Sequence, residues 1–265
     1  MDQLVVGLLS TIIDIYIVLL FVRMFATASE RYDAVFGMIY KATDPVVGPL
    51  GTALQLRRVD LSPLPVIIVL LLLKGMMWGS IPRIVQGFVD MLFQLYVLII
   101  IIISGFREYY INPIASFGQR MVNPIRAIAA NFSRQVVTVN LLSVLLLVIL
   151  HAIVTLILLN FRGGAMTGMA TVVPVKLVCI RSLGLIVNLT GFFTIVIIIN
   201  ALLSWVSPDP LNPVVQLITL ISAPIIDPVR RVIPPLGGMI DISPIIAIIA
   251  LQIANAVGHG VLSLL

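Results

Sequence analysis

Long apolar runs place the strongest constraint on how this chain can fold. A helix needs about 20 largely apolar residues to cross the hydrocarbon core of a bilayer. Six stretches approach that length, the last two interrupted by prolines or an aspartate: Leu4–Val22, Val136–Phe161, Leu183–Trp205, Ile242–Leu264, Leu61–Trp78 and Ile84–Ser104. The chain is 60% hydrophobic and 10% charged, and a soluble fold cannot bury that much apolar surface. We therefore predict an all-α polytopic membrane protein with about six transmembrane helices.

The positions of Lys and Arg predict the orientation of these helices. With the N-terminus outside, the inside loops hold 11 of the 16 Lys and Arg residues, and the outside loops, which would include Lys74 and Arg181, hold 5. Cytoplasmic loops are enriched in these residues, so both termini are expected on the non-cytoplasmic face. The start Met1-Asp2 is acidic, so the first span is expected to remain as a permanent helix. No basic stripe interleaved with aromatics is present, and nucleic acid is not an expected partner.

The most specific feature of the sequence is a repeat. The matched segments are Thr43-Asp-Pro45-Val-Val-Gly-Pro49 with Ser222-Ala-Pro224-Ile-Ile-Asp-Pro228, and Asp60-Leu-Ser62-Pro63 with Asp241-Ile-Ser243-Pro244. Each copy follows one apolar span and precedes another. The two copies therefore enter the membrane in the same sense, as parallel repeats.

A proline-punctuated amphipathic segment joins the two spans of the second copy. Asn212 and Pro213 predict a helix start, as an N-cap followed by proline at the first helical position. Pro224 is expected to stop this short helix, because proline lacks the N–H donor and clashes with the preceding turn. Asp227-Pro228 is expected to start a further turn. Such pieces should lie in, or re-enter, the cytoplasmic interface, with arginines reaching the headgroups.

These motifs resemble the YggT/YlmG family of bacterial and plastid membrane proteins, whose hallmark is this repeated unit. The second copy matches best, with Leu203-Ser204-Trp205-Val206 before the amphipathic segment and Arg230-Arg231 inside it. In the first copy Phe25-Ala26 replaces Ser204-Trp205, and the arginine pair is displaced to Arg57-Arg58. The resemblance implies a first repeat over residues 1–80 and a second over residues 166–265.

Residues 81–165 form an inserted central region, for which two transmembrane helices and a basic amphipathic loop are predicted. Within the loop, Asn112-Pro113 and Asn123-Pro124-Ile-Arg126 faintly echo the repeat. A degenerate third copy is one interpretation of this echo. The alternative is an unrelated insertion.

Few residues suggest chemistry inside the membrane. Asp14, in the middle of the first span, is either part of an ion or proton pathway or a carboxyl paired with a neighbouring helix, and the second interpretation is favoured. Asp90 is expected at an interface. Arg57, Arg58, Arg230 and Arg231 are candidates for binding anionic lipids or the acidic tail of a partner, with simple anchoring as the alternative.

Catalytic and cofactor signatures are lacking. His151 and His259 invite a bis-histidine haem hypothesis, but hydrogen bonding between helices is the favoured interpretation. The sequence has no metal-ligand spacing and no nucleophile or phosphate-loop motif. The single cysteine, Cys179, excludes an intramolecular disulfide. We predict a protein that is not an enzyme and that needs no cofactor or metal.

The resemblance implies several roles rather than one. Bacterial members are linked to osmotic tolerance, potassium homeostasis and envelope or division-site organisation, and plastid members to assembly of the cytochrome b6f complex and to nucleoid distribution. We expect a non-enzymatic scaffold or assembly factor of the bacterial cytoplasmic (inner) membrane. Its expected partners are anionic lipids and other membrane proteins or a second copy. An ion transporter or channel component is the alternative.

Overall fold

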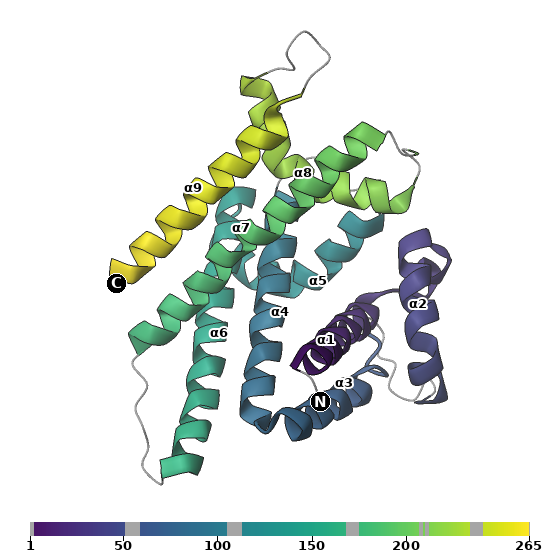
Figure 1. Ribbon diagram of the computed structural model, residues 1–265, viewed down its shortest axis with the longest axis vertical. Coiled ribbons are helices and arrows are strands. Elements are labelled where there is room, and N and C mark those ends of the chain that lie inside the picture. Colours follow the sequence, from purple (N-terminus) through teal and green to yellow (C-terminus); the bar gives the residue numbers. More distant parts are fainter. Residues whose placement is uncertain are drawn as a thin grey trace. The chain divides into compact units, whose positions relative to one another are not determined.

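Helices make up nearly all of the described part of the chain (Figure 1). The computed structural model describes residues 3–50, 59–104, 113–167, 175–206, 209, 212–233 and 241–264. The α-helices are α1 (Gln3–Phe25), α2 (Ala34–Val47), α3 (Leu64–Trp78), α4 (Ile81–Ser104), α5 (Pro113–Ala130), α6 (Val136–Thr167), α7 (Val175–Val206), α8 (Pro213–Val232) and α9 (Ser243–Leu264). The all-α membrane fold expected from the sequence is confirmed.

Five of the described helices are long and apolar enough to cross a bilayer: α1, α4, α6, α7 and α9. The sixth expected span, α3, is apolar but has only 15 residues. It begins after Pro63 and ends at Gly79, whose φ of 72° lies in the left-handed region that glycine adopts without strain. This turn lets α4 start two residues later, at Ile81.

The helices follow one order three times: a membrane-length or apolar helix, a helix with a proline inside it, and a second apolar helix. The middle helices are α2, α5 and α8, whose internal prolines are Pro45 in α2, Pro124 in α5, and Pro224 and Pro228 in α8. The residue two positions before the first of these prolines is buried in each helix: Thr43, Val122 and Ser222 are 0%, 0% and 1% exposed. The central region 81–165 therefore has the same succession of elements as the two repeats, and its basic loop is largely the helix α5.

The expectation that Pro224 stops a short helix is wrong. Asn212 does cap α8, accepting a hydrogen bond from the backbone N–H of Val214 at 2.9 Å, but the helix then runs without a break through both prolines to Val232. In Figure 1 the ribbon of α8 changes direction along its length, as a proline kink predicts. Packing explains the continuity, because Ser222 and Ile226 are buried and α8 packs on both α7 and α9.

The chain divides into two compact units, Met1–Phe88 and Val89–Leu265. In the first unit α1 packs on α2 and α3. In the second, side chains of α4, α5, α6 and α7 form one core, with Val97 and Val122 fully buried at its centre. A smaller core of Ile197, Ile226 and Ala247 joins α7, α8 and α9.

The contact of α7 with α9 depends on a glycine. A Cβ atom at Gly258 would lie 2.9 Å from both methyl groups of Val187, closer than carbon atoms pack.

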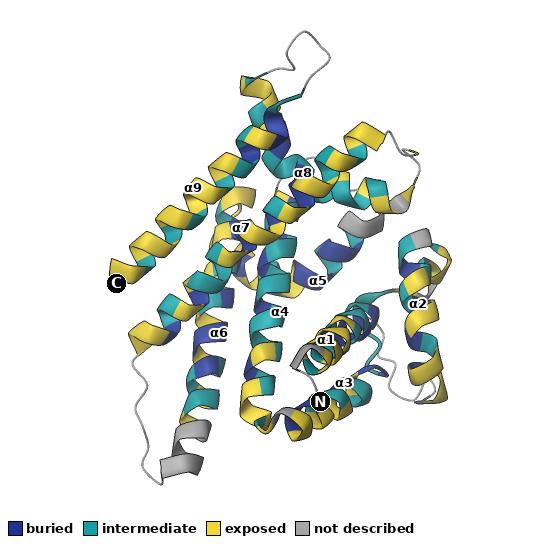
Figure 2. Cartoon of the chain, viewed as in Figure 1, coloured by how far each residue is buried: buried dark blue, intermediate teal, exposed yellow. Residues whose placement is uncertain are grey.

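The outward surface of α9 is largely exposed (Figure 2), with apolar side chains such as Ile249 and Val257 on it. Such a surface is suited to contact with lipid.

Candidate functional site

An ion pair joins two helices of the first unit. The Lys74 ammonium of α3 donates to both carboxylate oxygens of Asp14 in α1, at 2.5 and 2.6 Å. Lys74 is buried, while the Asp14 side chain is 48% exposed. A lone charge at the centre of a membrane helix costs about 2.5–3.5 kcal/mol, and pairing the two opposite charges reduces that cost.

This geometry bears on the two interpretations of Asp14. The carboxylate is paired with a neighbouring helix, which supports the structural interpretation. The assignment of Lys74 to an outside loop is wrong, because the residue lies inside α3. The pair could not be predicted from local sequence patterns, because its members are 60 positions apart.

A second polar network connects three helices of the second unit. Asp90 of α4 accepts from the Arg181 guanidinium of α7 at 2.5 Å and lies 2.9 Å from His151 Nε2 of α6. His151 Nδ1 lies 2.7 Å from the Ser182 hydroxyl of α7, which donates to the Val178 carbonyl at 3.0 Å. His151 and Ser182 are buried.

Sequence reasoning found the members of this network separately but not their association. Asp90 lies inside α4 with a 14% exposed side chain, whereas an interfacial position was expected. Hydrogen bonding, the favoured interpretation of the histidines, is confirmed for His151 and also for His259, whose Nε2 is 3.2 Å from Asn188 Oδ1. No group of three or more His, Cys, Asp or Glu side chains suited to a metal occurs in the described part of the chain.

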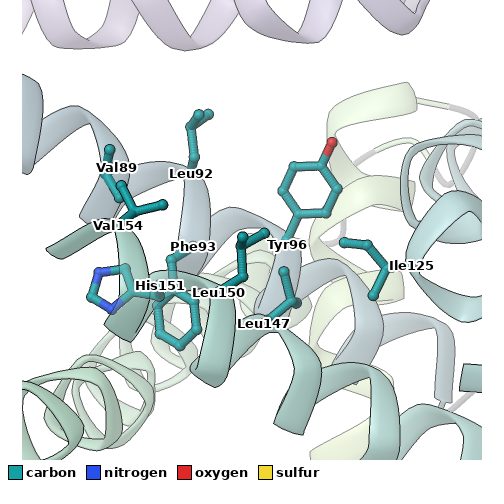
Figure 3. Close-up of a pocket in the computed structure, with 9 residues that line it drawn as sticks. All are labelled: Val89, Leu92, Phe93, Tyr96, Ile125, Leu147, Leu150, His151 and Val154. Atoms are coloured by element: carbon teal, nitrogen blue, oxygen red, sulfur yellow. The ribbon is translucent and has the colours of Figure 1, made fainter. Parts of the chain in front are cut away.

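Beside this network lies a cavity of about 340 Å³ between α4, α5 and α6. Figure 3 shows His151 and Phe93 at one end of it and Ile125 at the other. The ring centroids of Phe93 and His151 are 4.5 Å apart. Aliphatic and aromatic side chains line almost all of the cavity, so it suits an apolar group and not a hydrated ion.

The first repeat holds a compact charge cluster. Arg23, buried near the end of α1, donates to Thr43 and to Asp44 of α2, each at 2.8 Å. Arg31 pairs with the same Asp44 carboxylate. Both guanidinium groups lie over the ring of Tyr40, 4.9 and 5.6 Å from its centroid. The cluster fixes α2 against the end of α1.

In the second repeat a charge cluster lies at the C-terminal end of α8. Arg230 donates to Asp241 at 2.8 Å and lies 3.7 Å from Asp227. Burial tends to raise the pKa of the Asp241 carboxyl. Hydrogen bonds from Ser243 and the charge of Arg230 outweigh burial and hold that pKa below its usual value.

The Asp-x-Ser-Pro motif has the same geometry in both copies. Asp60 accepts from the backbone N–H of Ser62, and Asp241 accepts from that of Ser243, each at 2.9 Å. Ser62 and Ser243 are 2% and 0% exposed, and the prolines that follow them, Pro63 and Pro244, are also buried. The motif thus forms a turn at the starts of α3 and α9: Pro63 occupies the N-cap position of α3, and Ser243 is the first residue of α9.

The remaining candidate residues lie at the surface or outside the described residues. Arg231, Pro49 and Pro228 are exposed, and Trp205, near the end of α7, is 87% exposed. Arg57 and Arg58 lie outside the described residues. Of the four candidate arginines, Arg230 is therefore paired within the protein and Arg231 is exposed.

A family model described as CCB3/YggT matches residues 3–81 and 180–262, more than half of the chain. The chain belongs to the CCB3/YggT family. The two matched regions agree with two repeats and leave most of the central region outside the match. CCB3/YggT membership and the apolar helices together indicate a membrane protein.

Several bacterial proteins are similar in sequence to the chain. The uncharacterised protein PA0392 of Pseudomonas aeruginosa is 31% identical over 62% of this chain and 81% of its own length. A protein encoded in the proC 3′ region of Vibrio alginolyticus is 29% identical over 63% and 89%. The protein YggT of Escherichia coli is 25% identical over 56% and 72%. No solved structure matches the chain.

Proposed function

We propose that this CCB3/YggT protein is a non-enzymatic scaffold or assembly factor of the bacterial inner membrane, acting in envelope organisation, osmotic tolerance or the assembly of a membrane complex. One observation carries the proposal. The carboxylates within the described spans, Asp14 and Asp90, are both in ion pairs with a neighbouring helix. Paired carboxylates hold helices together: Asp14 joins α1 to α3, and Asp90 joins α4 to α7.

A conducting path would require different surroundings. Ion pathways are lined by several polar groups that converge on a pore or a water-filled cavity. The cavity beside His151 is lined almost entirely by apolar side chains. The geometry therefore favours a structural use of the intramembrane charges.

A scaffold also needs surfaces that other proteins can contact. Near the end of α7, Trp205 and Val206 are 87% and 75% exposed, and Val232 at the end of α8 is 79% exposed. The neighbouring Arg231 is exposed as well. Aromatic and arginine side chains are enriched at the contacts that dominate binding, so these two exposed positions, at opposite ends of α8, are suited to contact with a membrane partner.

An ion transporter remains the second candidate, and the Asp90–His151 pair is the observation that favours it. A carboxylate next to an imidazole can hold and pass a proton, and intramembrane ionisable residues often serve transport. The two functions differ in what they require of the intramembrane charges. A scaffold requires only that each intramembrane charge is neutralised by an opposite charge. Transport requires at least one of these groups to remain ionisable.

The experiment replaces the Asp14–Lys74 pair by a neutral pair. In a strain that lacks the gene and grows at high osmolarity, the double variant Asp14→Asn, Lys74→Met should restore growth as well as the wild type. Asp14→Asn alone should reduce the amount of protein in the membrane, because it leaves the buried Lys74 ammonium unpaired. Lys74→Met alone, which leaves the half-exposed carboxylate, should have a smaller effect.

Protein abundance and ion flux complete the test. Growth should follow the amount of folded protein in every variant, and the wild type in liposomes should conduct neither potassium ions nor protons. If the double variant failed to restore growth at normal abundance and the wild type conducted ions, the transporter function would be favoured over the scaffold function. Asp90→Asn, compared in the same flux assay, identifies the carboxylate responsible.

A further inference from the structure

A basic cleft lies where the amphipathic helix α5 meets the start of α6. We define it by Asn123 and Arg126 of α5, Ser133 and Arg134 of the connection, and Val136 and Val139 of α6; its volume is about 600 Å³. All of these residues lie between the two regions that the family model matches. The cleft is therefore a feature of the central region.

The charge of the basic cleft is not balanced within the described residues. Three cations elsewhere, Arg23, Lys74 and Arg230, pair with aspartates. In the cleft neither Arg126 nor Arg134 makes an ion pair with any described carboxylate. The Nε atom of Arg126 is also buried without a hydrogen-bond partner in the described structure. Two guanidinium groups thus present donors and positive charge to one cleft.

The walls of the cleft differ in polarity, and this difference suggests the class of ligand. Arg126, Arg134, Asn123 and Ser133 supply hydrogen-bond donors, and the Ser133 oxygen itself accepts from the backbone N–H of Gln135 at 3.2 Å. Val136 and Val139 belong to the first turn of the candidate span Val136–Asn160. A ligand in this position meets polar donors at the membrane surface and apolar side chains toward the bilayer.

We propose that the basic cleft binds the phosphate of an anionic glycerophospholipid. The planar guanidinium group matches the geometry of phosphate oxygens and donates two parallel hydrogen bonds to them. The glycerol and acyl chains would then run along Val136, Val139 and the outer face of α6, where Leu141 and Leu145 are exposed. The cleft includes neither Trp205 nor Arg231, and the scaffold proposal does not depend on it.

The test measures lipid binding by the full-length chain in a mild, uncharged detergent. Dioctanoyl phosphatidylglycerol should raise the melting temperature, whereas dioctanoyl phosphatidylcholine and inorganic phosphate should leave it unchanged. Arg126→Gln with Arg134→Gln should weaken binding of the anionic lipid at least tenfold. The matched control, Arg83→Gln with Lys176→Gln, removes two exposed cations at other helix ends and should retain wild-type binding.

A second variant tests the cleft without removing an arginine. Asn123→Asp is nearly isosteric at an exposed position and places a carboxylate beside Arg126, so it should compete with the phosphate and also weaken binding. An equal response to phosphatidylcholine would refute the proposal. So would competition by inorganic phosphate at the same concentration as the lipid, or unchanged lipid binding in the arginine and aspartate variants.

Discussion

At the scale of single residues, the described helices place opposite charges against each other. Asp14 with Lys74, Asp44 with Arg23 and Asp90 with Arg181 each join two helices. In an apolar medium the attraction between such charges is strong, and an unpaired member is costly. Arg23, Lys74 and Arg181 therefore fix helices to one another.

The first prediction concerns Asp241 and pH. The pKa of this carboxyl is lowered in the folded protein, so its ionised form contributes stability above the pKa of the unfolded chain, about 4. That contribution is lost as the pH falls through the lower folded pKa. Asp241→Asn keeps an acceptor for the Ser243 N–H but loses the charge opposite Arg230. Because Arg230 is half exposed, the loss should be about 0.5–1 kcal/mol at pH 7.

Thermal unfolding in detergent from pH 7 to pH 3 measures this contribution. The difference between the wild type and Asp241→Asn should be constant above about pH 5 and shrink as the carboxyl of the wild type becomes protonated. A difference that stays constant down to pH 3 would contradict the assigned role. Asp227→Asn is the matched control, because its pair with Arg230 is longer, at 3.7 Å.

At the scale of the element, the amphipathic helices show where sequence reasoning succeeds and where it fails. The cap of α8 could be predicted, because Asn212 acts on a backbone group two residues away. The hydrogen bonds of Asp60 and Asp241 within the Asp-x-Ser-Pro motifs are equally local. The end of α8 could not be predicted in this way, because helix continuation depends on packing against α7 and α9. The pairs of Asp14 and Asp90 lay beyond local reasoning for the same reason: their partners are contributed by other helices.

The second prediction concerns Pro224 and Pro228 of α8. Because the helix continues through both, replacing them by alanine should straighten α8 and leave its helical content nearly unchanged. Spin labels at the exposed positions Val214 and Val232, in a Cys179→Ser background, should move apart and approach the distance for 18 residues of straight helix, about 27 Å. Pro213→Ala, at the first helical position, should not change the distance. An unchanged distance in the double variant would show that the prolines do not bend α8.

The third prediction concerns Gly258, where α9 approaches α7. Gly258→Ala introduces a Cβ atom 2.9 Å from the methyl groups of Val187, and such overpacking costs about 1–3 kcal/mol. Gly260→Ala is the matched control, because no atom lies within 4 Å of its Cβ position. It should gain up to about 1 kcal/mol of helix propensity. Thermal unfolding of the two variants should therefore shift in opposite directions, and equal shifts would show that the α7–α9 contact tolerates the methyl group.

At the scale of the whole molecule, the same order of three helices recurs along the chain. The sequence revealed two copies through their Asp-x-Ser-Pro motifs and only an echo of a third in Asn123-Pro124. The central succession α4–α5–α6 lacks that motif, yet Pro124 and the buried Val122 occupy the positions of Pro224 and Ser222. The residue two positions before the proline is buried in all three helices. Packing at this position requires only a side chain of moderate size, so its identity can differ between the copies.

The fourth prediction concerns orientation in the membrane. Because 11 of the 16 Lys and Arg residues fall on one side of the proposed spans in the sequence, both termini are expected outside. Cysteines placed at the exposed positions Thr27 and Asn212, in a Cys179→Ser background, should resist an impermeant thiol reagent in intact cells. Both cysteines should react once the membrane is permeabilised. Reaction of both cysteines in intact cells would show that the protein has the opposite orientation.

The shortness of α3 bears on the bilayer itself. Its 15 residues extend about 22 Å at 1.5 Å per residue, whereas the hydrocarbon layer is about 30 Å thick. The left-handed turn at Gly79 ends the helix before it reaches full thickness. A transmembrane helix of this length would require the lipids beside it to compress or to exchange for shorter chains, at a fraction of a kcal/mol per Å of mismatch. A bilayer thinned in this way would also lower the cost of placing a second short helix beside it.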